Sequence, residues 1–211
     1  MQHVVLLGDS IFDNAAYVSG GPDVLSHLQG LLQSRAKATL LAVDGAVTTA
    51  VARQLARVPA DATHLVVSVG GNDALQHTGL LDRRARSSAE VLEWFGEAVD
   101  EFERHYRRML TAVLARRIPT TVCTIYNGCF SDRLFQRIAS TMLTMFNDVI
   151  IRVAIEHSLA VIDLRFVCVA AEDYANPIEP SSVGGEKIAR AIAGLVCGGN
   201  PVAPTIRIAI A

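Results

Sequence analysis

A serine follows the first apolar run of the sequence, where a nucleophile would be exposed. The run reads "HVVLLGDS", so Ser10 comes directly after Gly8 and Asp9. A serine at the carboxyl end of a strand can lie near a helix N-terminus, whose backbone N–H groups favour developing negative charge. Gly, Asp and Ser are also ordinary turn residues, and the tripeptide alone favours a simple turn. Ser10 is therefore a candidate nucleophile that needs support from other positions.

Two further positions supply the hydrogen-bond donors that such a serine would need. A tetrahedral oxyanion requires two or three N–H groups aimed at one point. The N–H of Ser10, the N–H of Gly45 and the carboxamide of Asn72 follow three successive apolar runs. Each of these residues alone also fits a turn or a helix cap. Their joint occurrence at matching strand ends predicts an oxyanion hole.

Short apolar runs rich in β-branched residues alternate with longer helical patterns. The expected strands are 3–7, 39–43, 64–69, 120–125 and 160–164, and the expected helices are 22–35, 46–57, 88–117, 133–157 and 184–197. Strands that are apolar throughout and separated by helices favour a parallel sheet covered on both faces. With right-handed crossovers this predicts an α/β fold, a three-layer α/β/α sandwich. Ligands of such sheets bind beyond the carboxyl ends of the strands, where the three candidate residues are expected.

The sequence contains no linker, internal repeat or low-complexity tract that would divide it. We therefore expect one domain spanning residues 1–211. "GGNP" at 198–201 ends the last expected helix. The role of the tail at 200–211 is left open, and a short edge strand in its last residues is one interpretation.

Three motifs in the first 75 residues resemble sequence blocks of the SGNH, or GDSL-type, hydrolases. They are "LLGDSIFDN", the glycine in "DGAVTT", and "VGGND", although Ile11 stands where the family name has leucine. The resemblance implies a flavodoxin-like α/β/α hydrolase fold with a five-stranded parallel sheet. It implies Ser10 as nucleophile, with Ser10, Gly45 and Asn72 forming the oxyanion hole. The implied reaction is hydrolysis of small-molecule esters or thioesters through an acyl-enzyme.

The fourth block of the family, Asp-x-x-His, is altered in this sequence. The matching stretch is "NPIEPSSVGG" at 176–185, in which Asn176 replaces the aspartate and Glu179 replaces the histidine. A carboxylate could accept the proton of Ser10, but Glu is a weaker base than His by about 2 pKa units, or roughly 3 kcal/mol of driving force. Burial would raise the pKa of Glu179 and recover part of this. Neutral Asn176 could then donate a hydrogen bond to Glu179, where an aspartate would repel it.

Three interpretations of the altered block remain open. The first is a serine hydrolase in which Glu179 is the base, and the second is rescue by His77, which follows "GGND" in the loop at the catalytic end. Three other histidines are expected at the opposite end of the sheet. His3 and His64 begin expected strands, and His157 ends the helix before the last expected strand. The third interpretation is a weakly active or inactive protein that binds a ligand in the same pocket.

Other acidic residues of the strand-end loops are candidates for secondary roles. Asp9 is expected to organise the turn through backbone hydrogen bonds, and Asp13 to line the pocket. Asp73 is expected to lie below the oxyanion hole. Asp173 is a reserve candidate for the base or for a residue that orients it.

Charge and composition narrow the class of partners. Hydrophobic residues make up 51% of the chain and charged residues 19%, with a net charge of −2, so we expect neither nucleic acid nor an anionic membrane as a partner. We expect that no apolar run is long enough to span a bilayer. The start of the chain lacks signal-peptide features, and the four cysteines lack metal-site spacing. A cytoplasmic protein without metal or cofactor is expected, and its oligomeric state is left open.

Overall fold

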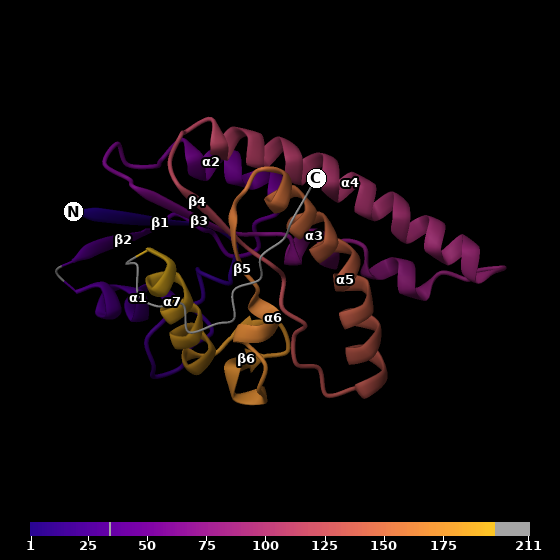
Figure 1. Cartoon of the computed structure of the whole chain (residues 1–211). Coiled ribbons are helices and arrows are strands. Elements are labelled where there is room, and N and C mark those ends of the chain that lie inside the picture. Colours follow the sequence, from indigo (N-terminus) through magenta and orange to yellow (C-terminus); the bar gives the residue numbers. More distant parts are fainter. Residues whose placement is uncertain (34, 197–211) are drawn as a thin grey trace.

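The computed structural model describes residues 1–33 and 35–196 (Figure 1). Its centre is a parallel sheet in the order β2-β1-β3-β4-β5. The strands are β1 (Gln2–Gly8), β2 (Ala36–Leu40), β3 (His64–Ser68), β4 (Thr120–Cys123) and β5 (Ala160–Ile162). The strand order reverses between β1 and β3, and such a reversal opens a crevice at the carboxyl ends of the strands. The expected α/β fold with a five-stranded parallel sheet is confirmed.

Helices cover both faces of the sheet because successive strand residues point to opposite sides. Val4 and Leu6 pack in a core with α1 (Val24–Leu32) and α7 (Ser182–Val196), whereas Val5 and Leu7 pack in a second core. The second core is built with α2 (Val51–Leu55), α4 (Ser88–Leu114) and α5 (Arg133–Glu156). All four strand residues are fully buried, which explains why β1 reads as a continuous apolar run.

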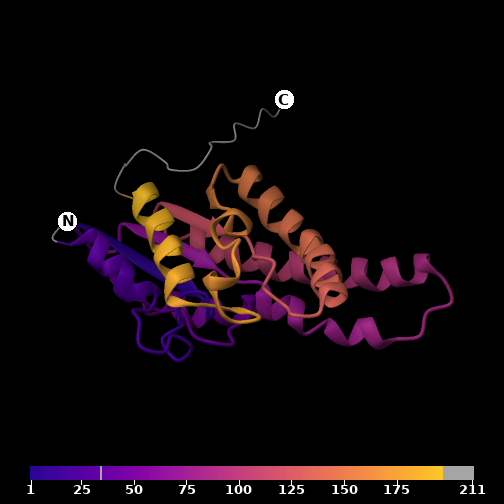
Figure 2. The same ribbon diagram turned by 90° about the horizontal axis from the view of Figure 1, so that it is seen from below.

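Helices α4 and α5, which pack in the second core, diverge toward the carboxyl edge of the sheet. The C-terminal halves of α4 and α5 are joined by ion pairs, Arg107–Glu156 at 2.5 Å and Arg152–Glu103 at 2.7 Å. The N-terminal half of α4 and the segment before it extend beyond the sheet as an arm (Figure 2). This arm includes α3 (Gly71–Leu75) and a 3₁₀ helix, η2 (Thr78–Asp82).

The second strand and the loop after the fifth strand differ from expectation. β2 begins and ends three residues earlier than expected, because Leu41 and Ala42 both donate to the carbonyl of Leu6 and so break the regular ladder. After β5 come α6 (Leu164–Val167), a 3₁₀ turn, and a hairpin of β6 (Tyr174–Asn176) with β7 (Glu179–Pro180). The hairpin was not predicted, because its strands are too short to show an alternating pattern. The interpretation of 203–211 as an edge strand lies outside the described residues.

The expectation that no apolar stretch is long enough to span a bilayer is wrong for α5. Within residues 1–33 and 35–196, this 24-residue helix alone is long and apolar enough to cross a membrane by length and composition. In the fold, 44% of its most apolar window is buried. Val149, Ile150 and Val153 are fully buried against the sheet, so core packing accounts for part of this apolar character.

Gly8 joins β1 to the candidate nucleophile and has no room for a side chain. Its φ is +128°, and an added Cβ would lie 1.7 Å from the carbonyl oxygen of Ser68. Gln54 fixes this backbone by accepting from the Gly8 N–H at 2.8 Å and donating to its carbonyl at 2.7 Å.

We expect Gly8→Ala to lower the free energy of unfolding by at least about 3 kcal/mol, because it combines strained backbone with a backbone clash. Urea unfolding measures the loss. Gly30→Ala is the control, since Gly30 lies in α1 with nothing within 4 Å of an added Cβ, and it should be neutral or stabilising. Equal stabilities of the two variants would contradict this prediction.

Candidate active site

Ser10 and Glu179 meet at the carboxyl edge of the sheet. The Ser10 hydroxyl donates to Oε1 of Glu179 at 3.0 Å, although the two residues are 169 positions apart in sequence. Both side chains are 6% exposed. Ser10 lies in the turn after β1, and Glu179 is the first residue of β7. The arrangement places a carboxylate oxygen within reach of the serine proton.

The loop that carries Glu179 is tied to two other strand-end loops. The side chain of Asn14 donates to the carbonyl of Pro180 at 3.1 Å and accepts from the N–H of Val24. The Tyr126 hydroxyl donates to the carbonyl of Ile178 at 2.6 Å. These bonds lie on either side of Glu179 in sequence and hold its backbone against the segments that follow β1 and β4.

Burial makes Glu179 a stronger base than an exposed glutamate. Removal from water raises the pKa of Glu179 to about 7, the hydrogen bond from Ser10 lowers it in part, and the charge of Asp44 raises it further. Its second oxygen, Oε2, is buried and has no hydrogen-bond partner among the described residues. The ionised form of Glu179 is therefore poorly stabilised, and transfer of the Ser10 proton to Glu179 would remove this buried charge.

Asn176 does not form the expected hydrogen bond with Glu179. Its Oδ1 accepts from the N–H of Ile178 at 2.9 Å, and the residue is exposed. Because Oε1 of Glu179 accepts from Ser10 and Oε2 has no partner, Asn176 does not orient the carboxylate. The expectation failed because an Asn two residues before a backbone N–H readily closes a local Asx turn.

The three expected oxyanion donors come from neighbouring strand ends. The side-chain nitrogen of Asn72 donates to the carbonyl of Ala46 at 3.0 Å, which ties the start of α3 to the residue after Gly45. Gly45 has a φ of +73°, a conformation that favours glycine, and it is exposed. A carboxamide nitrogen carries two hydrogens, so Asn72 keeps one for a ligand.

Two buried aspartates hold the backbone of the loops that follow β1 and β2, and neither accepts a hydrogen bond from the Ser10 hydroxyl. Asp9 accepts from the N–H of Ile11 at 3.2 Å, and burial raises its pKa to about 8, so it stays protonated at neutral pH. Asp73 accepts from the N–H of Thr48 at 3.0 Å and from its hydroxyl, which joins α3 to the segment after β2. Burial also raises the pKa of Asp73.

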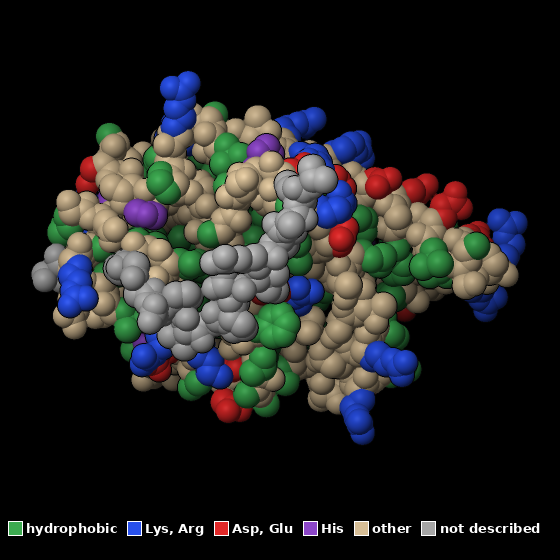
Figure 3. All heavy atoms as spheres, in the orientation of Figure 1, with side chains coloured by type: hydrophobic (Ala, Val, Ile, Leu, Met, Phe, Trp, Pro, Cys, Tyr) green, Lys and Arg blue, Asp and Glu red, His purple; other side chains and the backbone are tan. Residues whose placement is uncertain are grey.

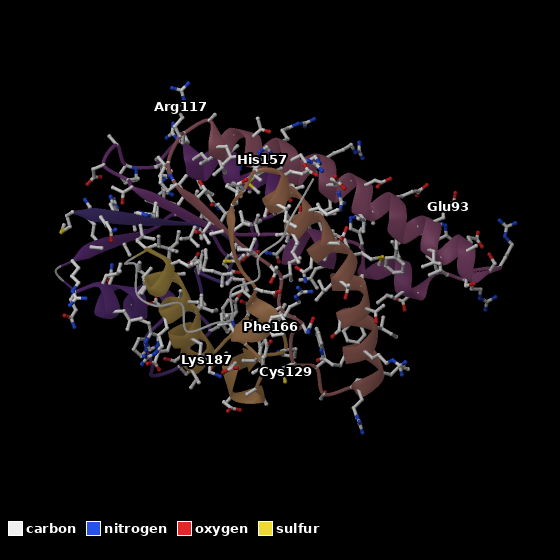
Figure 4. All side chains as sticks on the ribbon, in the orientation of Figure 1. Glu93, Arg117, Cys129, His157, Phe166 and Lys187 are labelled. Atoms are coloured by element: carbon white, nitrogen blue, oxygen red, sulfur yellow. The ribbon has the colours of Figure 1, made fainter. Side chains whose placement is uncertain are left out.

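No histidine forms a hydrogen bond with the Ser10 side chain, although all six histidines lie in the described part of the chain. The ring of His77 lies 6.2 Å from that of Phe146, and His77 does not line the cavity beside Ser10. His157 lies near Arg117, at the end of the sheet where strands begin and away from Cys129 in the loop after β4 (Figure 4). His27 contacts the hydroxyl of Ser182 at 3.0 Å, and this hydroxyl donates to the carbonyl of Pro22.

The two remaining acidic candidates serve other purposes. Asp13 accepts from the N–H of Asp44 at 2.9 Å and does not line the cavity. Asp173 is fully buried, accepts from the N–H groups of Val169 and Ala170, and pairs with Lys187 at 2.6 Å. Despite burial, the Lys187 ammonium and these N–H groups hold the pKa of Asp173 below its usual range. Asp173 is thus not a reserve base.

A mostly apolar cavity opens beside the Ser10–Glu179 pair. Its empty space amounts to about 800 Å³ when the open solvent at its mouth is counted. Ser10, Asn72 and Glu179 line it together with Phe130 of the loop after β4 and with side chains of α3, η2 and α5, which include Leu75, Leu81, Phe135, Ala139, Met142 and Leu143. Sequence reasoning missed this wall, because no helix was expected over residues 78–82 and the residues of α5 read as ordinary positions of a core helix.

Asp44 and Tyr17 were also missed. The Tyr17 hydroxyl donates to Oδ2 of Asp44 at 2.6 Å, and this bond, with the nearby carboxylates, raises the pKa of Tyr17 to about 12. The only sequence signal was the position of Asp44 directly before Gly45. Together with Asp13 they form an acidic rim, which we define as Asp13, Tyr17 and Asp44.

Residues 6–184 match the GDSL-like lipase/acylhydrolase family. The chain belongs to this family. No curated protein matches its sequence.

Several solved structures share the fold. A lipase, Lip_vut3 from a goat rumen metagenome, superposes with a TM-score of 0.69 at 18% identity, covering 93% of this chain and 98% of the lipase. An aryl esterase of M. smegmatis gives 0.67 at 12% identity, covering 94% and 99%. Phospholipase A1 from Streptomyces albidoflavus NA297 gives 0.65 at 15% identity, covering 88% and 95%. At these identities the likeness shows the fold, and the chemistry of this GDSL-like protein must be argued from its own residues.

Proposed function

We propose that this GDSL-like protein hydrolyses carboxylic esters or thioesters through an acyl-enzyme on Ser10, with Glu179 as general base. The 3.0 Å hydrogen bond from the Ser10 hydroxyl to a buried glutamate carries the proposal. Family membership supports ester hydrolysis in general. The serine–glutamate pair makes the proposal specific to this chain.

The proposed reaction begins with ionised Glu179. Its Oε1 accepts the proton as Ser10 Oγ attacks the ester carbonyl, and the oxyanion receives hydrogen bonds from Ser10, Gly45 and Asn72. Neutral Glu179 then donates the proton to the departing alcohol or thiol. In the second half a water molecule gives a proton to Glu179 and attacks the acyl carbonyl, and Glu179 then returns that proton to Ser10 Oγ as the acid leaves.

The direct test uses a fluorophosphonate probe and p-nitrophenyl acetate. Covalent labelling and ester turnover by folded protein are the expected results. Folded protein that neither labels nor turns over the ester would overturn the proposal. It would favour the alternative that the apolar cavity only binds a ligand.

We expect the rate at low substrate concentration, kcat/KM, to rise with pH and to level off above about pH 7. The reason is that only ionised Glu179 can accept the serine proton, and burial raises its pKa to about 7. A profile of kcat/KM between pH 5 and pH 9 with an uncharged ester measures this. A constant rate down to pH 5 would exclude Glu179 as the base.

A further inference from the structure

One apolar face of α5 lines the cavity beside Ser10, and Met142 on this face also belongs to the second core. Phe135, Ala139, Met142 and Leu143 recur at helical spacing and line the cavity beside Ser10. We call this set the α5 stripe. It extends along the helix for about 12 Å. The α5 stripe meets the buried core face at Met142, and the two together make α5 strongly apolar.

The opposite wall belongs to the arm. Leu75, Thr78 and Leu81 of α3 and η2 line the same cavity, so it is a cleft between the arm and α5. The space-filling view shows hydrophobic side chains at the surface between α5 and the N-terminal half of α4 (Figure 3). The ion pairs between the C-terminal halves of α4 and α5 keep the two helices together at the other end.

The two sides of Ser10 differ in polarity. On one side the cleft is lined by Ser10, Asn72, Glu179 and the α5 stripe, and no Lys or Arg of residues 1–33 and 35–196 lines it. The acidic rim lies beside Gly45, and none of its residues lines the cleft. Asp44 and Gly45 are exposed, so that side offers a route to solvent. In a two-step hydrolysis the alcohol must leave and water must enter while the acyl group stays attached.

We propose that the cleft binds the acyl chain of the substrate and that the α5 stripe sets its preferred length, which makes esters of medium-chain fatty acids the substrate class. This inference rests on the proposed function. An apolar wall stabilises each added methylene by removing it from water until the chain outgrows the stripe. The alcohol then lies toward the acidic rim.

The test compares p-nitrophenyl esters of acetate, butyrate, octanoate and palmitate. We expect kcat/KM to rise by up to about 4-fold for each methylene that the cleft buries, and to stop rising beyond octanoate. Ala139→Leu fills the cleft and should lower the octanoate-to-acetate ratio at least about 10-fold. Thr141→Leu is the matched control, because Thr141 is exposed on α5 and does not line the cleft, and it should leave the ratio unchanged. A flat series, or equal ratios in both variants, would overturn the inference.

Two further measurements separate the inference from the proposed function. Octyl acetate hydrolysed faster than methyl octanoate would assign the cleft to the alcohol and overturn the inference. In the Ser10→Ala protein, the methyl signal of Met142 should shift in NMR spectra when methyl octanoate is added, but not with methyl acetate. If no ester is hydrolysed by the unaltered protein and this shift persists, the proposed hydrolysis fails and acyl-chain binding stands. If esters are hydrolysed and no shift occurs, only the inference fails.

Discussion

Glu179→Gln should lower kcat/KM for p-nitrophenyl acetate by about 10²–10⁴-fold while leaving the protein folded. Glutamine has nearly the same shape and can still accept a hydrogen bond from Ser10, but it cannot take the proton. In a serine–histidine pair the base becomes a cation when it accepts the proton, whereas Glu179 becomes neutral. No positive charge then faces the oxyanion, so its stabilisation falls entirely on the three hydrogen-bond donors.

The same substitution should raise stability above pH 7. The unfolded carboxyl ionises near 4.5, but the folded carboxyl keeps its proton until about pH 7. Between these values the folded state binds more protons, so the contribution of Glu179 to stability falls as the pH rises through this window and remains low above it. We expect Glu179→Gln to gain about 1–3 kcal/mol of unfolding free energy at pH 8 and much less at pH 5. Activity lost together with stability would indicate a structural role for Glu179 instead.

Ser10→Ala should abolish turnover and fluorophosphonate labelling, with kcat reduced by about 10⁴–10⁶-fold. Without the hydroxyl no acyl-enzyme can form, and the oxyanion donors alone leave only weak catalysis. Intact-protein mass spectrometry should show one added phosphonyl group on the unaltered protein and none on the variant.

Ser182→Ala is the matched control for this experiment. Ser182 contacts His27 at 3.0 Å, but its hydroxyl donates to a backbone carbonyl rather than to a base. Labelling and turnover should therefore persist in Ser182→Ala. Retained labelling of Ser10→Ala would mean that another residue is the nucleophile.

The sequence predicted those parts of the fold that local patterns specify. β1 and β3 are continuous apolar runs buried on both faces, and α4 and α5 have long helical periodicity, so their bounds agree within three residues. The β6–β7 hairpin depends on contacts with distant loops, such as the bond between Asn14 and Pro180, and no local pattern specifies it.

The candidate site shows the same division. Ser10, Gly45 and Asn72 were chosen because each follows a strand, and parallel strands bring those ends together. The burial of Glu179 depends on how the whole loop folds, and sequence alone could only propose it. The lack of a hydrogen-bond partner for its Oε2 among the described residues was not expected. Asn176 was assigned a long-range role from its position in the altered block, but its side chain formed the nearest available bond. Local hydrogen bonds of this kind compete with any longer reach.

The acidic rim has a consequence for the end of the catalytic cycle. The product of ester hydrolysis is an acid that ionises at neutral pH, and it is released next to Glu179, with Asp44 and Asp13 close by. Glu179 is buried, so its ionised form repels the newly formed carboxylate strongly, whereas exposed Asp44 adds a weaker repulsion, and the uncharged ester precursor is not repelled. Accumulating fatty acid would then inhibit the protein only weakly, and the reverse synthesis of esters would be suppressed by the same repulsion.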